Sequence, residues 1–140
     1  WEVDAYPVNE ITEMVDSVSK GDIDTLVEEY YDKYEILLEG RSEKEFRNHV
    51  AVQAGIEIGF ERFLEEKNYH AIVTHFGDLG GLKQLPGLAI QRLMEKGYGF
   101  GGEGDWKTAA MGIEAVYIDG DTTIRNLQNE LRWNSMYFSK

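Results

Sequence analysis

Residues 69–102 read YHAIVTHFGDLGGLKQLPGLAIQRLMEKGYGFGG and contain the signals that decide the fold. The run at 69–74 is short, apolar and rich in β-branched residues, which predicts a buried strand. Pro86 suits the first turn of a helix, and Gly97 stands where a helix C-terminal cap belongs. Residues 100–102 predict a second short strand. A strand, a helix and a second strand in this order predict a parallel pair joined by a right-handed crossover.

Three helices are predicted before this segment. Apolar residues recur at three- and four-residue steps over 9–19. Gly21 ends that helix, and Asp22 can cap a second one that ends near Tyr34. A third, long helix begins at a capping box, in which Ser42 is followed three residues later by Glu45, and runs to about Lys67.

Two glycines, Gly55 and Gly59, lie four residues apart inside the long helix. Each costs about 1 kcal/mol in a helix relative to Ala, so the pair indicates that another backbone packs closely there.

The remainder of the chain continues the alternation of strands and helices. Residues 106–111 begin a helix, 114–118 form the clearest predicted strand, and Asp121 or Thr122 caps a last helix that extends to Met136. The pattern therefore predicts a single α/β domain over 1–140. It is expected to be three-layered and Rossmann-like, with a mainly parallel sheet and flanking helices.

The amino-acid composition argues against several classes of partner and ligand for this protein. The chain has 140 residues and a net charge of −12, which disfavours nucleic acid as a partner because the phosphate backbone is also negative. No apolar run is long enough to span a bilayer, so no membrane partner is expected. The absence of cysteine excludes disulfides and thiolate ligands, and it suits a cytoplasmic location.

A glycine-rich loop follows the second predicted strand. Gly99, Gly101 and Gly104 have the spacing of a dinucleotide-binding fingerprint, but Glu103 and Asp105 would repel a pyrophosphate. The glycines instead suggest a backbone that passes close to other atoms and presents a carboxylate. Glu103 is therefore the main candidate for metal binding or acid–base chemistry, whereas Asp105 is expected to cap the helix at 106.

Other candidates are weaker. Of the three histidines, His75 follows the first strand and could take a metal or acid–base role, although a hydrogen-bonded loop residue is the simpler interpretation. His49 and His70 are interpreted as structural. The aromatic residues at 133–138 could stack on a sugar, but their helical spacing favours a packing face.

Several longer strings resemble the bacterial L-arabinose isomerases. The strings are GLKQLPGLA at 81–89 with its neighbours at 78–79 and 91–93, YGFGGEGDWKTAA at 98–110, and VDAYP at 3–7. Residues 1–111 resemble the central domain of that family. Residues 112–140 resemble its extreme C-terminus and are expected to complete the same domain. Family members carry a further region between these two parts, so Met111–Gly112 marks either a deletion or a stretch missing from the sequence.

The resemblance implies a metal-dependent aldose–ketose isomerase that converts L-arabinose to L-ribulose and, less well, D-galactose to D-tagatose. It implies Mn²⁺ as cofactor, Glu103 as a catalytic and metal-binding residue, and Phe76 as an aromatic residue of the sugar site. The other metal ligands of the family have no counterpart here, and His75 does not match any of them. The chain alone is therefore expected to be a fragment or engineered core that binds metal weakly and lacks useful turnover.

Two alternatives remain. One is a working minimal isomerase with a site shared across a homo-oligomer and built from Glu103, Asp105, His75 and Phe76. The other is a non-catalytic acidic scaffold or interaction module.

Overall fold

The computed structural model describes residues 2–75, 77 and 80–119, and within these ranges the chain forms five helices and one two-stranded parallel sheet. The elements in chain order are α1 (Val8–Asp16), α2 (Lys20–Lys33), α3 (Glu43–Lys67), β1 (Ala71–Thr74), α4 (Gly87–Glu95), β2 (Gly99–Gly102) and α5 (Trp106–Asp119). The predicted α/β class and the parallel strand–helix–strand unit are confirmed. The last predicted helix, from 121 or 122 onward, lies outside the described residues.

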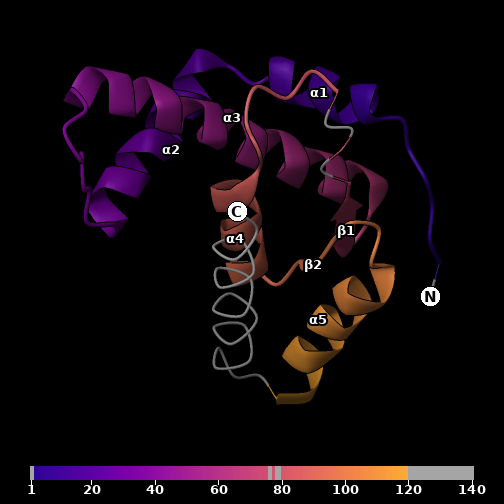
Figure 1. Ribbon diagram of the computed structural model, residues 1–140. Helices are drawn as coiled ribbons and strands as arrows, with labels where there is room; N and C mark the ends of the chain where they lie inside the picture. Colours follow the sequence, from indigo (N-terminus) through magenta and orange to yellow (C-terminus); the bar gives the residue numbers. More distant parts are fainter. Residues whose placement is uncertain (1, 76, 78–79, 120–140) are drawn as a thin grey trace.

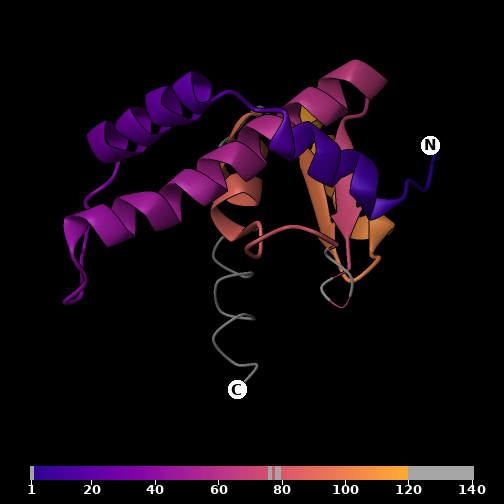
Figure 2. The same cartoon turned by 90° about the horizontal axis from the view of Figure 1, so that it is seen from above.

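The long helix α3 is the element on which the first two helices pack. Figure 2 shows α2 and α1 lying along successive parts of it. Its predicted capping box is confirmed, because the Ser42 hydroxyl accepts a hydrogen bond from the Glu45 N–H at 3.2 Å and the Glu45 carboxylate accepts one from the Ser42 N–H at 3.2 Å. Hydrogen bonds from the Ser42 hydroxyl and N–H hold the pKa of Glu45 below its ordinary value.

The start of α2 differs from the prediction. Ser19 is the N-cap, and its hydroxyl accepts the hydrogen bond from the N–H of Asp22, so Asp22 lies inside the first turn. Gly21, which was expected to end the preceding helix, is the second residue of α2. Ser and Asp are both strong N-cap residues, and here the more N-terminal of the two takes the position.

The close approach expected at the α3 glycines is confirmed at Gly59. A Cβ added to Gly59 would lie 2.7 Å from the Cα of Val15 and 2.6 Å from its Cγ2, so the backbone of α1 lies directly against α3. A Cβ on Gly55 would lie 3.5 Å from the Cδ1 of Ile23, which is an ordinary contact.

The sheet separates two groups of helices. In Figure 1 the strands lie between α3 above and α5 below. Phe100 belongs to a buried cluster with α3 and α4, whereas Gly99 and Gly101 point the positions of their missing side chains at α5. Because alternate residues of a strand face opposite sides, the strands are covered by helices on both faces. The cluster consists of Ile56, Phe60, Leu64, Ala89, Ile90, Leu93, Met94 and Phe100.

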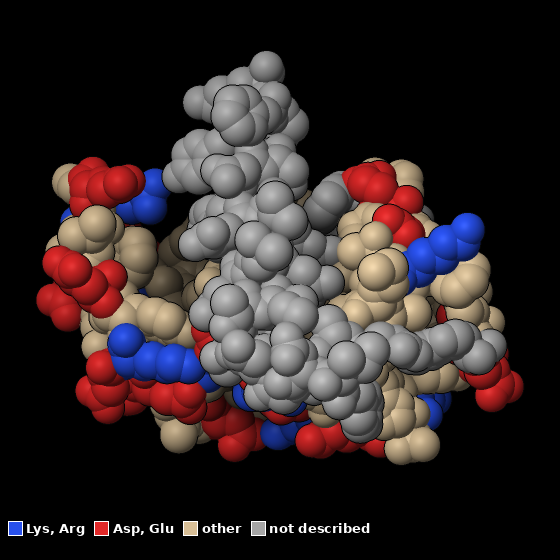
Figure 3. Space-filling model, turned by 90° about the horizontal axis from the view of Figure 1, so that it is seen from below, with Lys and Arg blue, Asp and Glu red and all other residues tan. Residues whose placement is uncertain are grey.

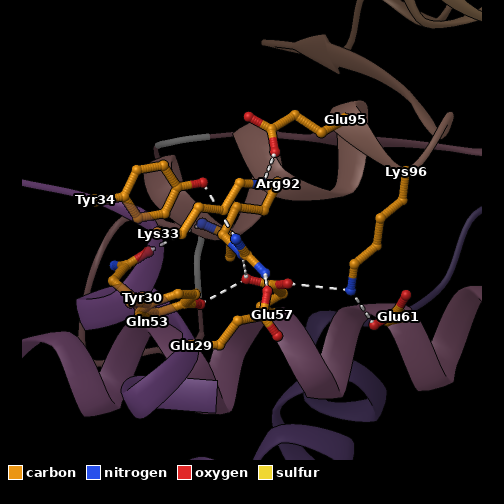
Figure 4. A network of polar contacts seen from close by, with 11 residues as sticks. Glu29, Tyr30, Lys33, Tyr34, Gln53, Glu57, Glu61, Arg92, Glu95 and Lys96 are labelled. Atoms are coloured by element: carbon orange, nitrogen blue, oxygen red, sulfur yellow. Dashed lines mark hydrogen bonds and ion pairs between the residues drawn. The ribbon is translucent and has the colours of Figure 1, made fainter.

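A buried polar network joins α2, α3 and α4, and Figure 4 shows its side chains converging on Glu57. Glu57 is fully buried, and its Oε2 accepts hydrogen bonds from Arg92 Nε at 2.7 Å and from the Tyr30 hydroxyl at 2.6 Å. Lys96 Nζ lies 3.1 Å from Glu57 Oε1. Arg92 also contacts Glu29 and the Tyr34 hydroxyl. Burial, together with the hydrogen bond to Glu57, raises the pKa of Tyr30 well above its ordinary value.

The strand predicted at 114–118 is wrong, because these residues form the C-terminal part of α5. A run as short as the five residues at 114–118 fits either a strand or a helix, so periodicity cannot separate the two. The helix that begins at Trp106 continues through this run to Asp119. None of the described helices combines the length and the apolar character required to cross a bilayer.

The contact at Gly59 predicts a different result for each of the two α3 glycines. Gly59→Ala should lower the free energy of unfolding by about 1–3 kcal/mol, because the backbone of α1 must move away from the new methyl group. Gly55→Ala is the matched control and should be neutral or stabilising by up to about 1 kcal/mol, because Ala is the better helix former and the space exists. Urea unfolding of both variants measures the difference, and an equal effect at the two positions would contradict the packing described.

The buried network predicts a large cost for removing its arginine. Arg92→Met should destabilise the fold by about 3 kcal/mol, because it leaves the buried Glu57 carboxylate with fewer donors. Adding Glu57→Gln should recover part of that loss, since the uncompensated charge is then gone. Lys20→Met breaks the exposed pair with Asp24 and should cost less than about 1 kcal/mol. Thermal and urea unfolding test all three variants, and a double variant no more stable than Arg92→Met would refute the coupling between Arg92 and Glu57.

Candidate functional site

The carboxyl ends of β1 and β2 lie at the same edge of the sheet. The strands pair in parallel, from Ala71 with Gly99 to Thr74 with Gly102. The residues that follow, His75 and Glu103, therefore leave the sheet side by side. This edge is where parallel α/β sheets place their functional groups.

Glu103 occupies an unusual backbone conformation. Its φ is +54°, in the left-handed region, and the next residue, Gly104, has a φ of +81°. The Asp105 N–H donates to the Gly102 carbonyl at 3.0 Å and closes this turn. Non-glycine residues are uncommon in this region, and such residues cluster at functional sites. The side chain of Glu103 is 56% exposed, so its carboxylate faces solvent rather than the core.

His75 is the partner of this carboxylate. Its Nε2 lies 3.4 Å from Glu103 Oε2, and its Nδ1 accepts a hydrogen bond from the Gly77 N–H at 3.1 Å. The interpretation of His75 as a hydrogen-bonded loop residue is therefore confirmed. His75 and Glu103 were expected together only in the minimal-isomerase alternative, and the structure brings these two side chains of one chain together. The signal for that contact is the strand register, which places the residue after β1 beside the residue after β2.

Asp105 caps α5 as predicted. Its carboxylate accepts hydrogen bonds from the Thr108 N–H at 3.1 Å and from the Thr108 hydroxyl at 2.6 Å. These hydrogen bonds hold the pKa of Asp105 below its ordinary value. Because the carboxylate serves the helix end, Asp105 is not oriented as a second acid beside Glu103.

The remaining predicted residues are not brought to this edge. Phe76 lies outside the described residues, so its predicted role in a sugar site stays a prediction. The His49 ring contacts Gln84, and the backbone carbonyl of His70 accepts the N–H of Gly99 at the opposite end of β1. The side-chain contact of His49 agrees with the structural role expected of it, whereas the contact of His70 is made by its backbone.

An open groove of about 550 Å³ runs along β1 on the side away from β2. Its walls are mainly apolar and come from the N-terminal segment, α3, β1 and α5. Its lining includes His75 and Gly104, so it reaches the Glu103 turn.

Few of the described side chains at this edge of the sheet could bind a metal ion. Within the described ranges, no three His, Cys, Asp or Glu side chains lie close enough together to hold an ion. Glu103 offers an exposed carboxylate, which is the ligand type that hard divalent ions prefer. It fits a metal site as one ligand and requires others to complete the site.

Acidic residues outnumber basic ones, with 26 Asp and Glu against 14 Lys and Arg. Figure 3 shows Asp and Glu side chains spread over one face of the molecule, with Lys and Arg residues between them. This distribution agrees with the net charge of −12.

The site is thus the exposed Glu103 carboxylate, carried by a glycine turn at the carboxyl edge of two parallel strands in an α/β domain. The family described as the L-arabinose isomerase central domain matches residues 1–119, and the chain belongs to that family. The match extends past Met111 and includes the whole of α5.

Individual relatives agree with the family match. The chain is 53% identical over 111 residues to the L-arabinose isomerase of Pectobacterium atrosepticum, which covers 79% of this chain and 22% of that protein. It is 50% identical over 121 residues to the L-arabinose isomerase of Serratia proteamaculans, covering 86% and 24%. The L-arabinose isomerase of Yersinia pseudotuberculosis is 53% identical over 111 residues, with 79% and 22% covered. The chain thus spans about a quarter of the length of these relatives.

Proposed function

We propose that this chain is the central α/β part of a cytoplasmic L-arabinose isomerase, in which Glu103 is a metal-binding and catalytic acid. The observation that carries the proposal is the exposed Glu103 carboxylate on its glycine turn, in a chain that belongs to this family. The substrates are L-arabinose and, less well, D-galactose, and the metal is Mn²⁺. The relatives' names support the arabinose assignment.

The residues of this chain supply part of what the reaction needs. Isomerisation moves hydrogen between C1 and C2 of an aldose and requires a base that holds a proton and a group that polarises two oxygens. A bound divalent ion supplies the polarisation. Glu103 can hold the ion through one carboxylate oxygen or hold the proton, and its exposure leaves it accessible to a sugar.

One carboxylate is too few ligands for a working site. The chain spans about a quarter of its relatives' length, so the proposal places the remaining ligands in the other three quarters or in a neighbouring subunit of a homo-oligomer. The 140-residue chain alone should therefore bind Mn²⁺ weakly and form no ketose above background. Ketose production by the purified chain would instead support the minimal isomerase.

Metal binding by the chain itself gives a first test. Mn²⁺ should broaden the amide NMR signals of Gly102, Glu103 and Gly104 before others, because the ion relaxes nuclei near its ligand. Glu103→Gln should weaken binding by roughly tenfold, since ligand charge sets affinity for such ions. Glu13→Gln, on an exposed position of α1, should leave binding unchanged. Equal broadening in the wild type and in Glu103→Gln would argue against the metal-binding role.

A test of catalysis requires the chain to be placed in a full-length enzyme. The 121-residue stretch of this chain that matches the Serratia proteamaculans enzyme can replace its counterpart there, and the hybrid should form L-ribulose from L-arabinose in a Mn²⁺-dependent ketose assay. Glu103→Gln in the hybrid should lower kcat by about a hundredfold or more, as expected for loss of an acid–base group. An active hybrid that keeps its rate with Glu103→Gln would rule out the catalytic assignment.

A further inference from the structure

The His75 ring has a defined orientation. Its Nδ1 accepts the Gly77 N–H at 3.1 Å, so Nδ1 carries no proton. In the neutral ring the proton then lies on Nε2, the atom that faces Glu103 Oε2 at 3.4 Å. The backbone of the loop thus selects the tautomer that can donate to Glu103.

Gly77 allows this arrangement because it lacks a side chain. A Cβ at this position would lie 2.8 Å from His75 Cε1 and 3.0 Å from Nδ1. Any other residue would push the imidazole out of its place, although the ring can move without disturbing the fold.

The pair contributes little to folding. Its side chains are 66% and 56% exposed, and exposed ion pairs are worth between about 0 and 1 kcal/mol. Its effect is instead on the orientation of the Glu103 side chain. The Glu103 backbone is held by the turn that the Asp105 N–H closes, so the carboxylate can still move only by a change of side-chain rotamer. A donor beside one carboxylate oxygen restricts that rotamer.

We propose that His75 is a positioning residue for Glu103: its Nε2–H, 3.4 Å from one carboxylate oxygen, would hold that oxygen and leave the other free for a divalent ion. The proposal rests on the metal-binding role of Glu103 proposed above. Carboxylate ligands are commonly oriented by such outer hydrogen bonds, and loss of the partner costs about tenfold or more in metal affinity. Gly77 is the third member of this arrangement, because its amide holds the ring.

Nitrogen NMR of the 140-residue chain tests the orientation without any metal. At about pH 8, His75 should show a protonated Nε2 and an unprotonated Nδ1, because Nδ1 accepts the Gly77 N–H. Gly77→Ala should return the ring to the tautomer mixture of a free side chain. A protonated Nδ1 in the wild type would overturn the proposal.

Mn²⁺ affinity of the same chain tests the consequence. His75→Ala and Gly77→Ala should each weaken binding by about tenfold, and His75→Gln, which keeps an N–H donor, should recover part of the loss. His70→Ala at the other end of β1 is the matched control and should bind as the wild type does. Unchanged affinity in both His75→Ala and Gly77→Ala would refute the positioning role.

Electron spin echo spectroscopy of bound Mn²⁺ separates positioning from direct ligation. No imidazole nitrogen coupling should be lost on going from the wild type to His75→Ala. A coupling that disappears in His75→Ala would make His75 a metal ligand and overturn the proposal. If Glu103→Gln weakens binding and His75→Ala does not, this inference fails alone. If Glu103→Gln has no effect, it fails together with the proposed function.

Discussion

The backbone of α5 lies directly on strand β2 because Gly99 and Gly101 of that strand have no side chains to separate it from the helix. A Cβ on Gly99 would lie 2.2 Å from the Ala109 carbonyl oxygen, and one on Gly101 would lie 2.0 Å from the Asp105 carbonyl oxygen. Any larger residue at either position would have to displace a whole helix. This contact also fixes the turn at 102–105, and with it the place where the Glu103 carboxylate leaves the sheet.

The opposite face of the sheet depends on α3, which is held in two different ways. At Gly59 it is held by the shape of the backbone, which admits α1 at van der Waals distance. At Glu57 it is held by charge, because a carboxylate with no exposure must retain Arg92, Lys96 and the Tyr30 hydroxyl around it. An apolar core alone tolerates small shifts of one helix over another, whereas a buried carboxylate with directional donors fixes one arrangement.

Local signals in the sequence predicted much of this fold. The Ser42 and Glu45 capping box and the Asp105 cap act over a few residues, so their consequences could be derived directly. Of the two α3 glycines, only Gly59 has the close backbone contact that was expected. The strand expected at 114–118 was wrong because so short a run is compatible with either a strand or a helix.

Ion pairs between residues far apart in the sequence could not be predicted from the sequence. Glu57 and Arg92 belong to different helices, and no local pattern distinguishes them from surface charges. Glu103 was found from its glycine neighbours and its family resemblance. The register of the two strands shows that His75 and Glu103 of the same chain lie side by side.

The parallel topology also determines when the carboxylate and the imidazole can meet during folding. Ala71 pairs with Gly99, and the whole of α4 lies between them in the sequence. The hydrogen bonds between the strands are therefore non-local, and forming them requires closing a long loop of chain. Helical turns form in microseconds or less, whereas contacts of large sequence separation form late. A collapsed chain that has all five helices but unpaired strands would keep Glu103 and His75 apart. Their proximity is thus a property of the finished fold and would report its completion.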